Sequence, residues 1–289
     1  MAASLMDEPS AEPLLAAAAA DGVDLRTLLE GDAARLRPTE MAQPSLLFIE
    51  CALLHLVPNQ VEVVAVAGHS VGEYSACVAA GALDPVTAMH LVIARGRAMA
   101  AVREGAMAAF LGMAEDAVAD VCVEASRQTR ETVVVANLNA PGQVVVSGTP
   151  AAVDAATRLA RGRGLRRAIA LEVSGAFHSP LMEPASAAYG DVLDAAPLRD
   201  PRVPVVCNVD GAAVSDARTL RDRLQRQLTA AVRWVDCVRA MVQLGADTLV
   251  EIGPGSVLTG LARRIVPDVR ALAINDAAGA RALTAAATP

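Results

Sequence analysis

The segment Gly68-His69-Ser70-Val71-Gly72 constrains this chain more than any other. Residues 63–67 before it form an apolar run typical of a buried strand, and residues 73–80 after it are typical of a helix. A Gly-x-Ser-x-Gly pattern between a strand and a helix predicts a nucleophile elbow, which lifts the serine hydroxyl to the end of a sheet. The amide of Val71, at the start of the helix, could then receive an oxyanion. Glycines also flank serines in ordinary strand-to-helix turns, so the flanking runs carry much of this argument.

Composition narrows the class of protein. The 289 residues are 54% hydrophobic and carry a formal net charge of −7 without a basic run, so we expect no nucleic acid partner. Every apolar run is too short to span a bilayer, so we expect no membrane partner. The cysteines are odd in number and lack metal-ligand spacing, which favours buried reduced thiols in a cytoplasmic protein and predicts no metal site. They are Cys51, Cys77, Cys122, Cys207 and Cys237.

Strand-like and helix-like runs alternate along the chain, which predicts an α/β fold. Residues 105–173 follow the order β-α-β-β-α-β, which is the ferredoxin-like order. We therefore expect a hydrolase-like core with a parallel sheet, formed by residues 1–104 and 174–289, and a small ferredoxin-like domain inserted at 105–173.

A serine nucleophile needs a general base, and the chain has four histidines. His178 is the best candidate because it lies in a loop between a predicted strand and a predicted helix. His69 belongs to the elbow and should point away from Ser70, whereas His55 and His90 fit apolar packing positions. The stretch between Ser70 and His178 offers no loop aspartate for a triad, so a backbone carbonyl could orient the imidazole instead.

The elbow and its extension to Glu73 and Tyr74 closely resemble the malonyl-CoA:acyl carrier protein transacylases. Four further motifs resemble that family in the same order and with similar spacing, and the resemblance runs from about Met1 to Asn275. These motifs lie at residues 94–97, 137–144, 175–179 and 251–255. The resemblance places Met1 just after the family's opening strand and its Gly-Gln-Gly-Ser-Gln loop, which supplies the second oxyanion amide.

The resemblance implies a role for each matching residue. Ser70 would be acylated, and His178 would act as its base and then as the acid for the leaving thiol. Arg95 would hold the free malonyl carboxylate, because a guanidinium pairs with a carboxylate through two parallel hydrogen bonds. A surface arginine on a helix is the alternative for Arg95. The main-chain carbonyl of Gln227 would steady His178, and the Gln227 side chain would not be the active group.

The resemblance also implies residues that shape the substrate site. Gln43 and Asn139 would lie beside it, the latter on the small domain. Phe177, directly before the histidine, matches the aromatic residue found in members that take malonyl rather than methylmalonyl groups. Val71 also suits malonyl.

The sequence thus predicts an acyltransferase that moves malonyl from coenzyme A to the phosphopantetheine thiol of acyl carrier protein through an ester of Ser70. The coenzyme A thioester is a substrate, and no other cofactor is expected. Two alternatives stay open at this point. One is a serine esterase or thioesterase of α/β type, and the other is a catalytically impaired remnant that binds the carrier.

Overall fold

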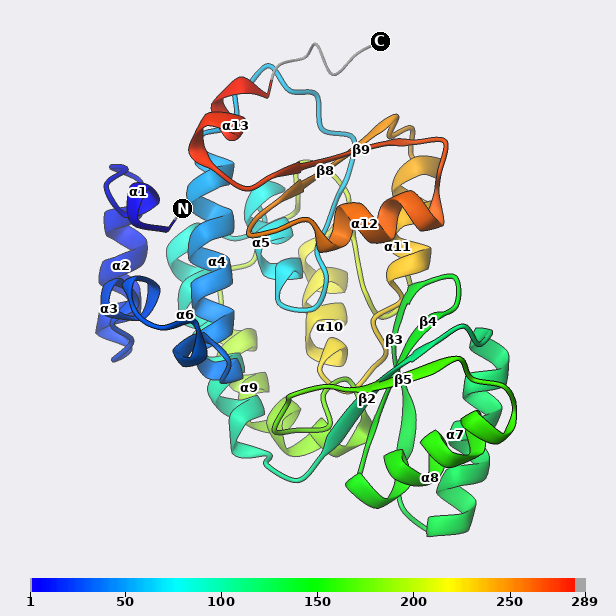
Figure 1. Ribbon diagram of the computed structural model, residues 1–289. Coiled ribbons are helices and arrows are strands. Elements are labelled where there is room, and N and C mark those ends of the chain that lie inside the picture. Colours follow the sequence, from blue (N-terminus) through cyan, green and yellow to red (C-terminus); the bar gives the residue numbers. More distant parts are fainter. Residues whose placement is uncertain (1, 284–289) are drawn as a thin grey trace.

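The structure, a computed structural model, describes residues 2–283. Figure 1 shows a larger part built from both ends of the chain and a smaller part, drawn in green, built from its middle. The helices are α1 (Ala2–Met6), α2 (Ala11–Ala20), α3 (Leu25–Glu30), α4 (Thr39–His55), α5 (Gly72–Ala79), α6 (Pro85–Ala101), α7 (Glu115–Thr129), α8 (Pro150–Gly162), α9 (Glu183–Ala195), α10 (Ala217–Gln227), α11 (Trp234–Gln243), α12 (Val257–Ile265) and α13 (Ala277–Ala282), with short 3-10 helices η1 (Ala33–Leu36) and η2 (Pro180–Met182). The strands are β1 (Val66–Ala67), β2 (Ala106–Leu111), β3 (Val133–Ala140), β4 (Gln143–Gly148), β5 (Arg167–Ala170), β6 (Val205–Val206), β7 (Ala213–Val214), β8 (Thr248–Ile252) and β9 (Arg270–Ile274).

The larger part contains the parallel strand pairs expected of an α/β protein, and the predicted fold class is confirmed. Its strands form two sheets, one ordered β1-β6-β7 and one made of β8 and β9. The pairs β1–β6 and β8–β9 are parallel, whereas β7 is an antiparallel edge strand that the sequence did not predict. Helices α4, α5, α6 and α9 pack beside them around one large hydrophobic cluster. Within residues 2–283 no helix has both the length and the apolar character to cross a membrane.

The strand before the elbow is shorter than its apolar run predicts. Only Val66 and Ala67 form ladder pairs, with Val205 and Val206 of β6. Val63 and Val64 are 45% and 37% exposed, so their apolar side chains do not belong to a buried strand. Within the described part of the chain β1 is the first strand, and everything before it is helix or loop.

Three helices near the start of the chain were not predicted. Their sequence signals are weak, because α2 is largely alanine and α1 and α3 are only five and six residues long. One signal is nevertheless present: the Asp24 carboxylate accepts a hydrogen bond from the Thr27 amide, which caps α3. The helices cover α4 and α6, and Leu5, Leu14 and Leu25 are buried there.

The smaller part is the predicted ferredoxin-like subdomain. Strands β2 to β5 form an antiparallel sheet in the order β3-β4-β2-β5, with α7 and α8 as its helices. Alternate residues of a strand point to opposite faces. Accordingly Phe110 and Val146 belong to the hydrophobic cluster under α7 and α8, whereas Met107 and Val145 belong to a second cluster on the other face.

The carboxyl-terminal part of strand β3 meets the larger part of the molecule. Val232 accepts a hydrogen bond from the Leu138 amide at 2.9 Å and donates one to the Ala136 carbonyl at 2.8 Å. Arg264 on α12 also donates to the Pro141 carbonyl at 2.8 Å. These contacts fix the carboxyl end of β3, where Asn139 lies, against the larger part.

Candidate active site

The backbone at Ser70 has the shape of a nucleophile elbow. Ser70 has a φ of +54°, in the left-handed region that residues other than glycine rarely adopt. A Cβ at Gly68 would lie 1.9 Å from the Gly72 carbonyl oxygen, so only glycine fits there. A Cβ at Gly72 would meet no neighbouring atom within 4 Å, so steric crowding does not require glycine there.

Asn208, just after β6, holds the two sides of this turn together. Its Oδ1 accepts a hydrogen bond from the Ser70 amide and its Nδ2 donates one to the Gly68 carbonyl, both at 2.8 Å. Its own amide donates to Glu73 Oε2 at 3.0 Å. Asn208 is fully buried, so these bonds face no competition from water.

The structure brings His178 to Ser70. His178 Nε2 lies 2.7 Å from Ser70 Oγ, and Nδ1 lies 3.0 Å from the main-chain oxygen of Gln227. A carbonyl only accepts, so Nδ1 carries the proton and Nε2 presents its lone pair to the serine hydroxyl. His178 has a φ of +56°, and the loop after it is held by Ser179, whose hydroxyl donates to the Ala176 carbonyl.

His178 is tuned to stay neutral. Burial, and after it the positive charge of Arg95, lowers the pKa of His178 to about 3, although the bond to the Gln227 carbonyl opposes this. The imidazole is therefore a free base at neutral pH. An anion bound at Arg95 would cancel part of the repulsion and strengthen the base.

Arg95 is a buried cation surrounded by neutral oxygens. It is only 1% exposed, and its guanidinium donates to Gln43 Oε1 at 2.6 Å, Gln227 Oε1 at 2.8 Å and Ser70 Oγ at 3.2 Å. Its Cζ lies 5.8 Å from the centre of the Tyr74 ring. Within residues 2–283 no carboxylate forms an ion pair with it, and its Nε has no hydrogen-bond partner. Because a buried charge is costly without a counter-ion, this site is suited to an anionic ligand.

Helix packing places Gln43 beside Arg95. A Cβ at Gly96 on α6 would lie 2.9 Å from the Glu40 Cα on α4, so the glycine allows the two helices to approach closely. Gln43 is 4% exposed, and its Nε2 is held by the Thr39 hydroxyl at 2.8 Å, which turns Oε1 toward the guanidinium.

The remaining predicted residues lie around this centre. The Val71 amide stands at the start of α5, and no residue from 2 to 283 accepts a hydrogen bond from it. Phe177 is half-buried and packs against the hydrophobic clusters of both parts of the molecule. Asn139 contacts His69 rather than Ser70: its Oδ1 lies 2.8 Å from Nε2 of His69.

The other two histidines do not pack in the core, contrary to the sequence analysis. His55 is exposed at the end of α4. His90 Nδ1 lies 2.7 Å from Asp21 Oδ2 on a half-exposed surface. The apolar residues around each histidine in the sequence suggested burial. Each side chain nevertheless lies on the outer face of its helix.

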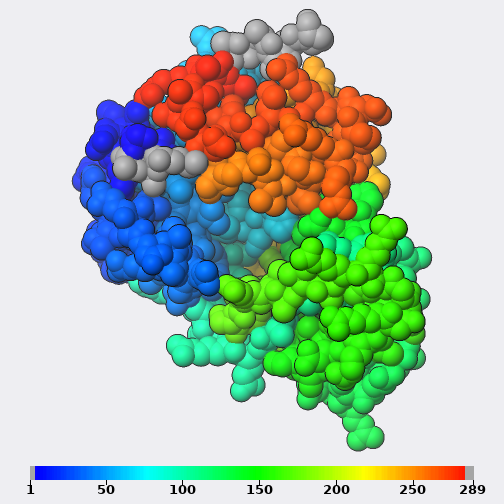
Figure 2. Space-filling view, in the orientation of Figure 1, coloured from blue at the N-terminus to red at the C-terminus, as the bar shows by residue number. Residues whose placement is uncertain are grey.

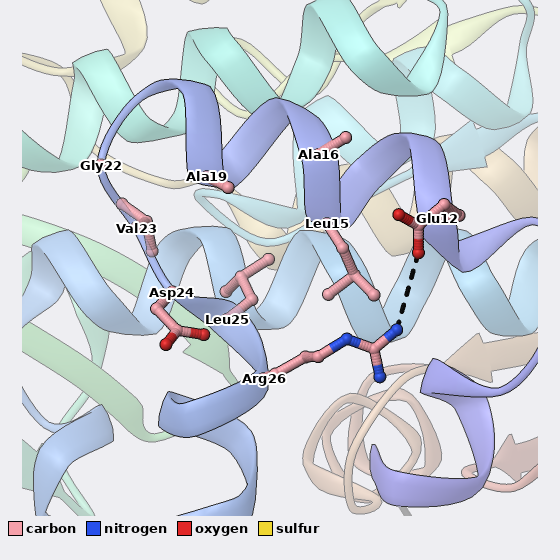
Figure 3. Close-up of a pocket in the computed structure, with 9 residues that line it drawn as sticks. All are labelled: Glu12, Leu15, Ala16, Ala19, Gly22, Val23, Asp24, Leu25 and Arg26. Carbon is pink, nitrogen blue, oxygen red and sulfur yellow. Dashed lines mark ion pairs between the residues drawn. The ribbon is translucent and has the colours of Figure 1, made fainter.

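The site residues lie apart from the cavity between α2 and α3. Figure 2 shows cyan atoms of the chain in a recess between its blue, orange and green parts. A cavity of about 440 Å³ lies elsewhere, lined by nine residues of α2, α3 and the turn between them, where Arg26 pairs with Glu12 at 3.6 Å (Figure 3). It contains none of the residues of the candidate active site. In the part of the chain that the structure describes, no three His, Cys, Asp or Glu side chains are grouped to hold a metal ion.

Sequence reasoning missed Asn208, Glu73 as a buried partner of the elbow, and the Gln227 side chain. One signal could have found Asn208: it directly follows an apolar strand, and the carboxyl ends of neighbouring parallel strands lie together at one sheet edge.

Residues 1–280 match the family described as acyl transferase domain. The malonyl CoA-acyl carrier protein transacylase of Escherichia coli (strain K12) is 41% identical over 284 residues, which are 96% of this chain and 90% of that protein. The crystal structure of malonyl-CoA:acyl carrier protein transacylase from Xanthomonas oryzae pv. oryzae has a TM-score of 0.88 and 39% identity, covering 93% of this chain and 87% of that one. A type II PKS acyl-carrier protein in complex with its malonyl-transacylase gives a TM-score of 0.89 and 37% identity, covering 94% and 90%.

The pH dependence of Ser70 reactivity tests the link between Arg95 and His178. Labelling by a fluorophosphonate requires neutral His178, so in the wild type it should persist well below pH 6.5, the usual pKa of histidine. Arg95→Ala removes a charge that disfavours the imidazolium, so the acidic limb of the profile should move up toward 6.5. Ser70→Ala is the unlabelled control. Superimposable profiles for the wild type and Arg95→Ala would contradict the assigned coupling.

Proposed function

The chain belongs to the acyl transferase domain family, and we propose that it moves a malonyl group from coenzyme A to the phosphopantetheine thiol of an acyl carrier protein. The observation that carries the assignment of roles is a buried guanidinium, without a counter-ion, 3.2 Å from a serine hydroxyl that also contacts a neutral histidine. A nucleophile next to a carboxylate receptor suits an acyl group that ends in a carboxylate.

The first half of the reaction acylates Ser70. As Ser70 Oγ attacks the thioester carbon of malonyl-CoA, His178 Nε2 takes the hydroxyl proton. The oxyanion that forms is received by the Val71 amide, at the start of α5. When the tetrahedral intermediate collapses, the carbon–sulfur bond breaks and His178 returns the proton to the coenzyme A thiolate.

The second half runs the same steps with the carrier. The phosphopantetheine thiol gives its proton to His178 and its sulfur attacks the Ser70 ester. The carbon–oxygen bond to Ser70 breaks, and His178 reprotonates the serine. These steps are acyl and proton transfers that change no oxidation state. The thioesters are therefore substrates, and the proposed reaction requires no separate cofactor.

Arg95 selects the acyl group in both halves. Its planar guanidinium holds the free carboxylate by two parallel hydrogen bonds, with Gln43 steadying it from α4. In this proposal Phe177, directly before His178, is the wall that rejects a methyl branch. Asn139 lines the site from the subdomain through its contact with His69.

Three finer assignments complete the proposal. Residues 105–173 are the inserted domain, and residues 1–104 and 174–289 are the catalytic domain, as supported by the separate hydrophobic cluster of the small sheet.

All five cysteines are free and buried, which suits a reducing, cytoplasmic setting. A backbone carbonyl rather than a carboxylate orients His178, which favours a transferase over a serine hydrolase with an acid-containing triad.

Mass spectrometry after mixing with malonyl-CoA tests the central proposal. The wild type should gain one malonyl group on Ser70 and release it to a carrier thiol, and Ser70→Ala should gain none. Ser75→Ala, on the helix α5 that follows Ser70, is the matched control and should keep the adduct. Rapid loss of the adduct to water would instead indicate a hydrolase, an adduct on another residue would remove Ser70 from its role, and no adduct at all would indicate an impaired protein.

Arg95→Ala should discriminate between acyl groups. Loss of two charge-assisted hydrogen bonds should lower kcat/KM for malonyl-CoA by about 100-fold or more, whereas transfer of acetyl, which has no carboxylate, should be retained. Arg95→Lys keeps the positive charge but lacks the planar guanidinium. Its kcat/KM for malonyl-CoA should lie between those of the wild type and Arg95→Ala. Equal losses on malonyl-CoA and acetyl-CoA would show that Arg95 only supports the fold.

Phe177→Ser should relax the selection against methylmalonyl-CoA. One methyl group in a pocket is worth about 1–3 kcal/mol, so the preference for malonyl over methylmalonyl should fall by roughly tenfold or more without reversing. Phe177→Tyr keeps the wall and should keep the ratio. If the ratio of kcat/KM values is the same in all three proteins, Phe177 has no part in specificity.

A further inference from the structure

The Gln227 side chain is fully buried at the end of α10 and lies among the charged groups of the site. Its Oε1 accepts a hydrogen bond from Arg95 at 2.8 Å. Its Nε2 donates to Glu73 Oε2 at 2.7 Å and to the Ser70 carbonyl at 3.0 Å, and lies 3.4 Å from Asn208 Oδ1. The orientation of the amide is fixed, because the flipped amide would turn its NH₂ toward a guanidinium and its oxygen toward a carboxylate.

Glu73 is a potential competitor for Arg95. It is fully buried on α5, and its Oε1 has no hydrogen-bond partner within residues 2–283. Burial raises the pKa of Glu73 to about 7, while its bond from Gln227, its bond from the Asn208 amide and the charge of Arg95 lower it. Arg95 Nε is also unpartnered within residues 2–283, yet no ion pair joins the two residues.

The Gln227 amide lies between these two groups. Its oxygen accepts from Arg95 and its NH₂ group donates to Glu73. A direct ion pair between Glu73 and Arg95 in this buried place would be strong and would neutralise the guanidinium. A neutral amide oxygen takes one N–H and leaves the positive charge uncancelled.

We propose that the Gln227 side chain is a positioning residue that keeps Glu73 from pairing with Arg95, so that the guanidinium stays available to the carboxylate of the acyl group. This inference rests on the proposed function, because it assigns Arg95 as the carboxylate receptor. It is separate from the role of the Gln227 main-chain oxygen, which orients His178 and is present whatever the side chain. The other polar groups that contact Arg95 or Glu73 are Gln43, Ser70, Tyr74, Asn208 and Cys207, and none of them is a carboxylate.

The test uses Gln227→Met, which keeps the length of the side chain and removes the amide, and Gln227→Glu, which places a carboxylate against Arg95. Both should raise KM for malonyl-CoA by about tenfold or more, corresponding to at least one lost charge-assisted bond. Both should lower kcat/KM for acetyl-CoA by a smaller factor than they lower kcat/KM for malonyl-CoA. Fluorophosphonate labelling of Ser70 should persist in both, because the carbonyl that orients His178 remains.

The decisive variant is the double change Glu73→Gln with Gln227→Met, which removes the competing carboxylate as well. It should reverse most of the rise in KM for malonyl-CoA that Gln227→Met causes. Glu73→Gln alone is the matched control. A KM that stays high in the double variant, or equal losses on malonyl-CoA and acetyl-CoA, would overturn the inference while leaving the wild-type malonyl adduct intact. Absence of that adduct in the wild type would overturn the proposed function and the inference with it. If neither Gln227 variant folds, as judged by circular dichroism, the side chain is structural and the inference is wrong.

Discussion

The uncompensated charge of Arg95 is the constraint on which the rest of the site depends. Two glutamine oxygens and the Ser70 hydroxyl satisfy its hydrogen bonds without cancelling its charge. The same charge helps to keep His178 neutral. In the proposed function the arginine would therefore couple selection to chemistry, because an acyl carboxylate bound to it would also remove part of the repulsion that weakens the base. An uncharged acyl group would gain neither effect.

Buried hydrogen bonds hold the residues around Arg95 in place, two of them in strained backbone conformations. Ser70 and His178 both have positive φ angles, and each is fixed by bonds to buried groups from α10 or from the end of β6. Strained positions of this kind persist only where the surroundings over-determine them. The close α4–α6 contact at Gly96 and the β3–Val232 bridge extend the same rigidity to Gln43 and to Asn139.

Local patterns predicted most of the fold and failed where strand pairing or burial depended on distant residues. The inserted subdomain was predictable because each strand alternates and each helix is amphipathic against one sheet face. The run 63–67 misled because apolar residues indicate a strand only when another strand pairs with them, and Val63 and Val64 have none. Helices α1 to α3 were missed because alanine fits almost any environment and the turns are short.

Within the site, motifs brought Ser70, His178, Arg95 and Gln43 forward, yet they could not assign the amides. The Asn208 contact to Ser70 spans 138 positions in the sequence and the Gln227 contact to the Ser70 carbonyl spans 157. An amide both donates and accepts, so its residue type carries no information about which end faces which charge. That assignment comes only from the surrounding groups: a cation on one side and a carboxylate with a carbonyl on the other admit one orientation of Gln227. The side chain that the sequence set aside as inactive is therefore the one that bonds the Arg95 guanidinium at one end and the Glu73 carboxyl group at the other.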